Sequence, residues 1–495
     1  MLTTMKKSVL TISAIIAASA VMAQSAEDAL RFSQTYQQGT ARSAAMGGAF
    51  GALGGDVSVL ATNPAGMSIY KDGAFSFTPV FGNVTSNNTF NGVESEDDRF
   101  SFKLSNIGFV TSHHNGNEGG FSGFAFGMAF NRLNNFNINQ KVAGRNDVSS
   151  FLDYWTKRSQ GVHPDNLNDI YDYRAYDLYL FDEVSQDPYQ YQNVYGYPGA
   201  GVSYGEYQTY ISTAKGGINS WDFAFSGVYA EKVYFGASLG IQSLNYKNVA
   251  TFKEEDLSNQ FSFEDWSFKE EMQYRGSGVN FKAGVIVKPV NFLRFGAAVH
   301  TPTYYALHKK VYTRYDACYD NEAPMDPSIP DAYEYDFRFH SPFKGILSGA
   351  FIVPNIGLLS VEYEYVDYRK SRVELNEEDN HDFSDVNQDI KDLYQATKNF
   401  RVGAEYLAGQ VALRAGYAVY GNPYRKVSES IQRQIFSAGV GFKGDGFFFD
   451  ITGTYHLYNS EADLYPSVDP TSIAAPTYKI DNRHLYVMLA FGFNF

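Results

Sequence analysis

Strict alternation of apolar and polar side chains is the feature of this sequence that most restricts its fold. Near the C-terminus, Phe447, Phe449 and Ile451 alternate with Asp450 and Thr452, and several other segments alternate in the same way. A period of two places all the apolar side chains on one face of a β-strand. In a water-soluble sheet the polar face meets solvent, whereas in a membrane barrel the apolar face meets lipid. Alternation alone therefore predicts strands without choosing between these two folds.

The number and spacing of the alternating segments favour a barrel. We predict strands at residues 74–87, 100–113, 120–137, 219–230, 233–248, 273–287, 292–315, 335–352, 357–375, 398–408, 411–424, 431–443, 446–464 and 482–495. Short links, such as Gly409-Gln410 and Gly444-Asp445, alternate with mostly longer ones. Membrane barrels have an even number of strands, short periplasmic turns and longer extracellular loops. The sequence therefore predicts an all-β fold, a single 14-stranded antiparallel transmembrane β-barrel.

Both ends of the chain indicate export to an outer membrane. Lys6 and Lys7 precede an apolar stretch at residues 9–20 that ends near Ala23, which predicts a signal peptide at residues 1–23. One face of the last strand carries Leu485, Val487, Leu489, Phe491, Phe493 and Phe495. This strand resembles the sorting signal of bacterial outer-membrane proteins. The barrel assembly machinery is therefore an expected partner, through the strand that ends at Phe495.

Composition argues against several classes of function. Cys318 is the single cysteine, so neither an intrachain disulfide framework nor a multi-cysteine metal site is possible. The formal charge of -14 argues against a nucleic-acid partner, because the phosphate backbone demands clustered Lys and Arg. No pairing of serine with histidine indicates a nucleophilic site. We expect no enzyme activity, no cofactor and no metal.

A glycine-rich leader and an Asn-Pro motif precede the first predicted strand. The leader runs from Gly39 through Arg42 to Gly55, and Asn63-Pro64-Ala65-Gly66 follows it. In this position the segment resembles the hatch of the FadL/TodX-type outer-membrane transporters of long-chain fatty acids and other hydrophobic compounds. The resemblance implies a hatch at residues 24–73, folded inside a barrel at residues 74–495. The hatch residues that it implies are Gly39, Arg42, Asn63, Pro64, Ala65 and Gly66.

The resemblance also implies a function. It is that of a passive channel in the outer membrane of a Gram-negative bacterium, acting as a monomer and without a cofactor. A long-chain fatty acid or other hydrophobic small molecule would be captured at the surface, pass to an inner pocket gated by the hatch, and leave laterally into outer-membrane lipid beside a kinked third strand. The residues assigned by this analogy are Leu30, Phe32 and Arg132 for ligand contact, and Asn131, Asn134 and Asn135 for the lateral gate.

Each of these assignments has an alternative. Asn63 and Pro64 either hold a tight turn in the hatch or only mark the start of the first strand. Leu30 and Phe32 either touch ligand or belong to a disordered leader. The amide-rich run at 131–137 is expensive in a strand that faces lipid, so it either marks a kink or already projects above the membrane.

Charged residues on the polar faces of the strands allow two interpretations. They are Lys282, Arg294, His300, Glu362, Glu364, Arg401, Glu405, Arg414 and Asp450. A cation among them suits a carboxylate headgroup. A ladder of paired charges that anchors the hatch is the interpretation we favour.

The long link at 138–218 is rich in tyrosine. It contains Tyr171, Tyr173, Tyr176 and Tyr179, interleaved with aspartates. Short amphipathic helices are predicted near 150–159 and 166–184. The link is either an extracellular aromatic lid over the barrel mouth, since tyrosine joins apolar area to a polar tip, or a self-packed cap without a ligand role.

Two other classes of function compete with the hydrophobic channel. A polar-solute porin or a haemin or surface-ligand-binding barrel requires an accessible lumen or surface, and a hatch of this length argues against an open pore. A lipid-modifying barrel enzyme requires a nucleophile and a base, for which no compelling pair is present.

Overall fold

The computed structural model describes residues 26–495 except 37, 116, 118, 185–188, 197–203, 258–262, 321–331, 376–382, 426–430 and 467–474. The signal peptide predicted at residues 1–23 lies outside the described residues. Within these described ranges, no helix is long and apolar enough to cross a membrane.

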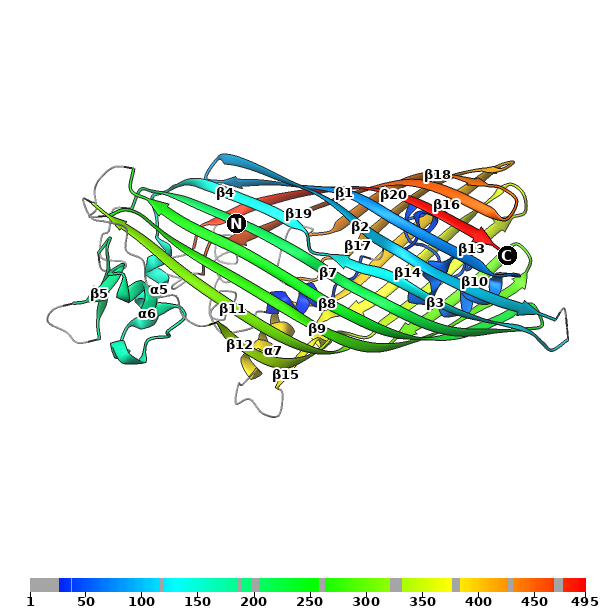
Figure 1. Ribbon diagram of the computed structural model, residues 1–495, viewed down its shortest axis with the longest axis horizontal. Coiled ribbons are helices and arrows are strands. Elements are labelled where there is room, and N and C mark those ends of the chain that lie inside the picture. The colour runs from blue at the N-terminus through cyan, green and yellow to red at the C-terminus, as the bar shows by residue number, and fades with distance from the viewer. Residues whose placement is uncertain are drawn as a thin grey trace, which may run out of the picture.

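One sheet of 18 strands closes on itself into a barrel (Figure 1). The strands are β1 (Ala74–Phe90), β2 (Val93–His114), β3 (Phe121–Asn135), β4 (Ile138–Asn146), β7 (Glu206–Tyr229), β8 (Val233–Glu255), β9 (Phe263–Val290), β10 (Leu293–His300), β11 (Tyr304–Tyr319), β12 (Tyr333–His340), β13 (Lys344–Val353), β14 (Gly357–Asp367), β15 (Arg372–Leu375), β16 (Ala396–Ala408), β17 (Val411–Tyr420), β18 (Arg433–Lys443), β19 (Phe447–Asp463) and β20 (Thr477–Asn494). β1 pairs antiparallel with β2 and with β20, which closes the ring.

Four strands of the barrel wall are interrupted. β3 and β4 both pair with β7, and β10 and β11 both pair with β9. β12 with β13, and β14 with β15, likewise form two broken strands. When each broken strand is counted once, the wall is the predicted 14-stranded antiparallel barrel, and the prediction is confirmed.

The outer face of the barrel is apolar, as a transmembrane barrel requires. On β20, Leu485 and Phe493 are 48% and 58% exposed, whereas Tyr486, Met488 and Ala490 between them are buried. Val361, Leu413 and Phe436 likewise point outward on their strands. Strict alternation thus predicted correctly which face of each strand meets lipid and which faces the lumen.

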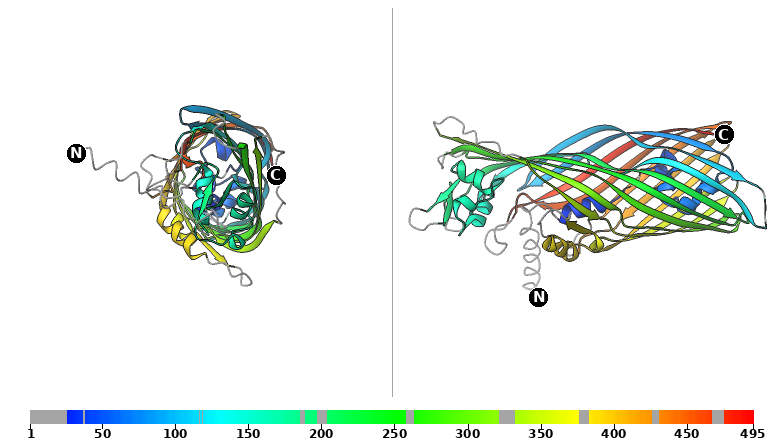
Figure 2. Two further views of the ribbon diagram at one scale, coloured as in Figure 1. Left: turned by 90° about the vertical axis from the view of Figure 1, so that its left-hand side faces the viewer. Right: turned by 60° about the horizontal axis from the view of Figure 1, so that its bottom comes forward.

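The described residues between Ala26 and Gly73 fold inside the barrel. Their elements are α3 (Ala26–Ser33), α4 (Ala41–Ala45) and the 3-10 helices η1 (Val57–Ala61) and η2 (Pro64–Ile69). Seen along the barrel, these dark blue elements lie within the ring of strands (Figure 2). Most of their side chains are buried. We call the segment from Ala26 to Gly73 the hatch.

The tyrosine-rich link is shorter than predicted. We expected it at 138–218, but β4 and the first half of β7 extend the sheet as a ladder from Ile138↔Ala214 to Asn146↔Glu206. The link proper spans 147–205. It holds α5 (Phe151–Ser159), η3 (Pro164–Asn166), α6 (Asp172–Asp177), β5 (Phe181–Glu183) and β6 (Tyr191–Asn193). These elements form a cap at the end of the barrel opposite the C-terminus (Figure 1).

Two further elements lie between β14 and β16. They are η4 (Tyr368–Lys370) and α7 (Ser384–Leu393), whose Val386 and Ile390 are buried against the aromatic residues around α3.

A lysine on the outer face tests the orientation of the strands. Val361→Lys, several residues above the short turn that precedes β14, should lower the free energy of unfolding by about 2 to 4 kcal/mol, the cost of a lysine near mid-membrane. Leu413→Lys, close to the short turn before β17, should cost less, because the penalty falls towards the interface. Urea unfolding in lipid vesicles measures both, with Val361→Leu as the matched control. Equal stability of Val361→Lys and the control would contradict the orientation.

Candidate functional site

The hatch is held in shape by its own caps. Thr40 begins α4, and its hydroxyl donates to Asp56 at 2.8 Å. Asp56 in turn accepts from the backbone N–H of Ser58 at 2.9 Å, which caps η1. Gly39 has a φ of +63°, a conformation that costs a side-chain-bearing residue energy. These contacts tie the leader to η1, although the two are separated in sequence.

A buried chain of charges fastens the hatch to the barrel wall. The Arg42 guanidinium donates to both carboxylate oxygens of Glu405, each at 3.0 Å. Glu405 also accepts from Arg414 at 2.6 Å, and Arg414 donates to Asp450 at 2.5 Å. Bidentate pairs of this kind fix orientation as well as adding energy. Arg42, assigned to the hatch from its sequence position, is thus the ionic link between α4 and β16, β17 and β19.

The other predicted lumen charges also point inward. Glu362 accepts from the Gly51 N–H at 2.7 Å, Arg401 bridges Glu362 and Glu364, and His300 contacts the Thr62 carbonyl at 2.7 Å. The remaining two are Lys282, paired with Asp222, and Arg294, which donates to the Leu53 carbonyl. These contacts favour the ladder interpretation for Glu362 and Arg401, whereas Arg294 and His300 contact backbone carbonyls of the hatch.

The Asn-Pro-Ala-Gly motif is a joint within the hatch. The Asn63 amide donates to the Gly51 carbonyl at 2.7 Å and to the Val285 carbonyl of β9 at 3.3 Å, while its oxygen caps η2. Pro64 takes the first helical position, where its missing N–H has no cost. Gly66 packs so closely on Gly54 that a Cβ on Gly66 would lie 2.8 Å from the Gly54 Cα. Ala65 is fully buried against the wall. The motif therefore does more than precede the first strand.

Leu30 and Phe32 lie in an aromatic chamber inside the barrel. Both are at least 95% buried, so this part of the chain is not a disordered leader. The Phe32 ring lies 5.1 Å from Tyr274, and about 6 Å from Phe136, Tyr246 and Phe339. α3 thus occupies an apolar space that is walled by β-strands and by α7. We call this space the chamber.

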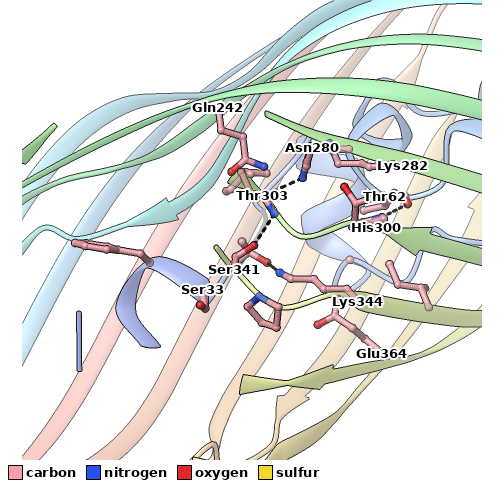
Figure 3. Close-up of a pocket in the computed structure, with 18 of the residues that line it drawn as sticks. Ser33, Thr62, Gln242, Asn280, Lys282, His300, Thr303, Ser341, Lys344 and Glu364 are labelled. Atoms are coloured by element: carbon pink, nitrogen blue, oxygen red, sulfur yellow. Dashed lines mark hydrogen bonds between the residues drawn. The ribbon is translucent and has the colours of Figure 1, made fainter. Parts of the chain in front are cut away.

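A polar cavity of about 60 Å³ adjoins the chamber (Figure 3). Phe32 and Leu133 contribute its apolar lining, and Lys282, His300 and Lys344 contribute nitrogen donors. The Lys344 ammonium, which is buried, donates to the Thr35 hydroxyl of the hatch. The cavity therefore joins the end of α3 to the inner wall.

The barrel wall is broken between its second and third strands. The β2–β3 ladder runs from His114↔Gly123 to Asn106↔Asn131 and ends there. Beyond this point β2 continues along β1, whereas β3 and β4 continue along β7. β3 shifts register against β7 between Arg132 and Asn134. The third strand therefore carries an irregularity within the amide-rich run at 131–137, and this run lies at the break.

Asparagine side chains form hydrogen bonds around the break. The Asn131 side-chain oxygen accepts from the Asn106 amide at 2.8 Å, and the Asn131 amide donates to the Asp222 carboxylate at 3.0 Å. The Asn134 amide donates to the Gln34 carbonyl of the hatch at 2.9 Å. The Asn137 oxygen accepts from the Gly216 N–H at 3.0 Å, where β7 adopts a positive φ. Of these contacts, the one with Asn137 satisfies a backbone N–H of the wall, as the absence of water within lipid requires.

The cap is packed on itself. Trp155 and Tyr191 are buried, together with the tops of β8, β9 and β11. Glu254 lies at its centre and accepts from Ser150, Phe151, Tyr195, Gln208 and Trp266 at 2.6–3.1 Å. Burial raises the pKa of Glu254, and it raises the pKa of Glu206 to about 7. Of the four tyrosines singled out in the sequence, only Tyr179 is exposed, so the contacts support the self-packed cap.

Sequence reasoning missed two features of the site. The pairing of Tyr36 with Arg433 joins residues far apart in the chain, and no local signal indicates it. The second feature is the run Gly236-Ala237-Ser238-Leu239-Gly240, which matches the nucleophile-elbow pattern. It lies inside β8 rather than at a strand-to-helix turn, so it carries no catalytic geometry. Among the described residues, no cluster of three or more His, Cys, Asp or Glu suits a metal ion.

Removal of one charge should loosen the hatch. Glu405→Gln leaves Arg42 buried without its partner, and breaking a buried pair in this way costs about 3 kcal/mol or more. We expect a lower free energy of unfolding and faster proteolysis of the hatch in detergent. Arg483→Gln, which removes an exposed pair with Asp481, is the matched control and should change little. If the two variants are equally stable, the ionic link does not anchor the hatch.

Comparison with known proteins places the fold. No family model and no curated protein matches the sequence. Among solved structures, the chain is similar to the P. putida toluene transporter TodX, with 13% identity over 92% of this chain and 98% of that chain and a TM-score of 0.52. It is also similar to a Pseudomonas aeruginosa FadL homologue, with 12% identity over 92% and 98% of the two chains and a TM-score of 0.54. The protein thus has the fold of the FadL and TodX barrels, as the hatch motifs indicated.

Proposed function

We propose that this protein is a passive outer-membrane channel that admits hydrophobic small molecules, long-chain fatty acids or hydrocarbons among them, into a Gram-negative cell. The observation that carries the proposal is the combination of an apolar chamber with a break in the wall, inside a barrel that the hatch fills. A porin for polar solutes needs a continuous aqueous lumen. Here α4, η1 and η2 fill the lumen, and charged contacts bind them to the wall.

The proposed route begins at the cap and passes through the chamber. Leu30 and Phe32 occupy the space that an acyl chain or aromatic ring would take, so a ligand has to displace α3. Burial of apolar surface repays this displacement, at about 0.8 kcal/mol for each methylene. The polar cavity beside Phe32 then receives the polar end of the ligand.

The proposed exit is the break beside Asn131, Asn134 and Asn135. The apolar part of a ligand that leaves there enters lipid directly and never crosses bulk water. The gain from burial in hydrocarbon drives this step, so no energy source is required. Outer-membrane lipid is then the acceptor, and one barrel suffices, which favours a monomer. Assembly through the strand ending at Phe495 fits this scheme, since Phe495 pairs with Gly73 at the seam of the barrel.

Uptake by cells that lack their own hydrophobic channels tests the proposal. Cells carrying this protein should take up radiolabelled oleate or toluene faster than cells without it, and small sugars should enter at the same rate in both. Heat-modifiable mobility on gels verifies that the barrel is assembled. Sugar entry without entry of oleate or toluene would favour the porin instead.

The Asn-Pro joint should matter for uptake more than for assembly. Asn63→Ala with Pro64→Ala removes the contacts to Gly51 and Val285 and frees the start of η2. We expect severalfold slower uptake of hydrophobic substrate by a barrel that still assembles. The chain offers a matched control in its second Asn-Pro pair, Asn422→Ala with Pro423→Ala, outside the hatch. Unchanged uptake in the hatch variant would remove the gating role from the joint.

A further inference from the structure

Arg433 differs from four of the other cations that face the hatch. Arg42, Arg401 and Arg414 each pair with at least one carboxylate, and Lys282 pairs with Asp222. Arg433, at the start of β18, has no carboxylate within 4 Å among the described residues. The ionisable side chains nearest to it are those of tyrosines and histidines. A buried charge without an opposite charge is costly, so its retention calls for an explanation.

Two tyrosine rings hold the guanidinium. Its carbon lies 4.1 Å from the centre of the Tyr36 ring and 4.3 Å from that of Tyr458. Cation–π contacts of this kind offset part of the lost hydration. One terminal nitrogen lies 3.4 Å from His484 Nδ1, while Nε is buried and has no hydrogen-bond partner. Arg433 therefore keeps an unused donor.

This donor lies at a small polar cavity of about 10 Å³. The cavity is lined by Tyr36, Gln38, Arg132, Asn134, Asn135, Arg433, His456 and Tyr486. It thus brings together two arginines and two amides of the broken third strand, but no carboxylate. The Gln38 side-chain oxygen is also buried without a partner. Two guanidinium groups without a carboxylate suit an anion once the Gln38 oxygen has turned away.

The cavity lies at the break in the wall. Arg132 stands at the register shift of β3, and its Nε donates to the Leu104 carbonyl of β2 at 3.0 Å. Lys103, also on β2, donates to Asn135 across the break. Neither cation has a carboxylate within 4 Å in the described part of the chain. Basic side chains therefore line both edges of the proposed exit.

We propose that Arg433 and Arg132, with Lys103 at the edge, form a binding site for the anionic headgroup of an amphipathic molecule at the break. The shared chemistry is a carboxylate or phosphate oxygen anion attached to an apolar tail. Its two sources are a fatty acid leaving the lumen, which rests on the proposed function, and a phospholipid reaching in from the membrane. The tail points through the break into lipid while the headgroup pairs with the guanidinium groups.

The hatch closes this site when no anion is bound. A cavity of about 10 Å³ holds roughly one water, so a carboxylate fits only after Tyr36 and Gln38 shift. Tyr36 is positioned by its N–H, which donates to the Leu133 carbonyl at 2.8 Å. The headgroup thus competes with the Tyr36 ring for Arg433. Binding of the anion is therefore coupled to movement of Tyr36 and Gln38.

A comparison of two ligands that differ only in the headgroup tests the site. Oleate and oleyl alcohol share one apolar chain, but only oleate carries a charge. In titrations of the purified full-length protein in neutral detergent, oleate should bind at least tenfold more tightly than the alcohol. The double variant Arg132→Gln, Arg433→Gln should lose this preference while binding of the alcohol stays the same. Arg433→Lys keeps the charge and should retain part of it, and the surface variant Arg483→Gln should retain all of it.

The second source is measured in parallel. Native mass spectrometry of the protein from vesicles containing phosphatidylglycerol should show bound lipid that the double variant loses, if membrane lipid is the occupant. The site would be overturned if a correctly assembled double variant kept both its preference for oleate over the alcohol and its bound phospholipid. Equal affinity of the normal protein for oleate and alcohol, without bound phospholipid, would also overturn it and leave the hydrophobic channel intact. If neither oleate nor the alcohol binds while phospholipid still binds at the arginines, the result counts against the channel and supports the site.

Discussion

Within lipid, no water can hydrogen-bond to backbone N–H and C=O groups, so the protein itself must supply their partners. This requirement governs the whole fold. It forces the strands to close through the β1–β20 ladder, and it makes any gap in the wall expensive. At the gap between β2 and β3, side chains bind backbone groups where the ladder has ended. The Arg132 guanidinium donates to the Leu104 carbonyl, and the Asn137 oxygen accepts from the Gly216 N–H. In the same segment, the Asn134 amide binds the hatch through the Gln34 carbonyl. The break in the wall and this attachment of the hatch therefore both involve the segment at 131–137.

Inside the barrel, different kinds of contact hold different parts of the hatch. The lower hatch is attached by paired charges, from Arg42 to Asp450, and by close backbone contacts such as Gly51 with Glu362. α3 is attached by aromatic packing around Phe32, by the Tyr274 hydroxyl, which donates to Asp28, and by a hydrogen bond between Ser33 and Ser371. Apolar packing is non-directional, so in the proposed route another apolar group takes the place of the Phe32 ring, whereas the ion pairs of Arg42 keep their geometry.

Much of this could be predicted from the sequence, because facing depends only on local alternation. Phe491 outward and Asp450 inward follow from a period of two. The extent of β7 did not follow, since its upper inward positions are Glu206, Gln208 and Ser212 and its outward positions no longer need to be apolar beyond the lipid. The hatch motif located Asn63 and Arg42, but not their partners. Partners depend on register and on closure, so the meeting of Tyr36 with Arg433 required the assembled barrel.

The longest strands set the height of the molecule. β9 has 28 residues, which at about 3.3 Å per residue is roughly 90 Å of chain, and a tilt of about 40° reduces this to a rise near 70 Å. The apolar band of such barrels is only about 25 Å tall. More than half of β9 therefore extends beyond the hydrocarbon and carries the cap, whereas β17, with 10 residues, is about as tall as the apolar band. In the proposed route, a hydrophobic molecule that enters beside these long strands is sheltered from the charged sugar layer of the cell surface before it reaches the depth of the membrane.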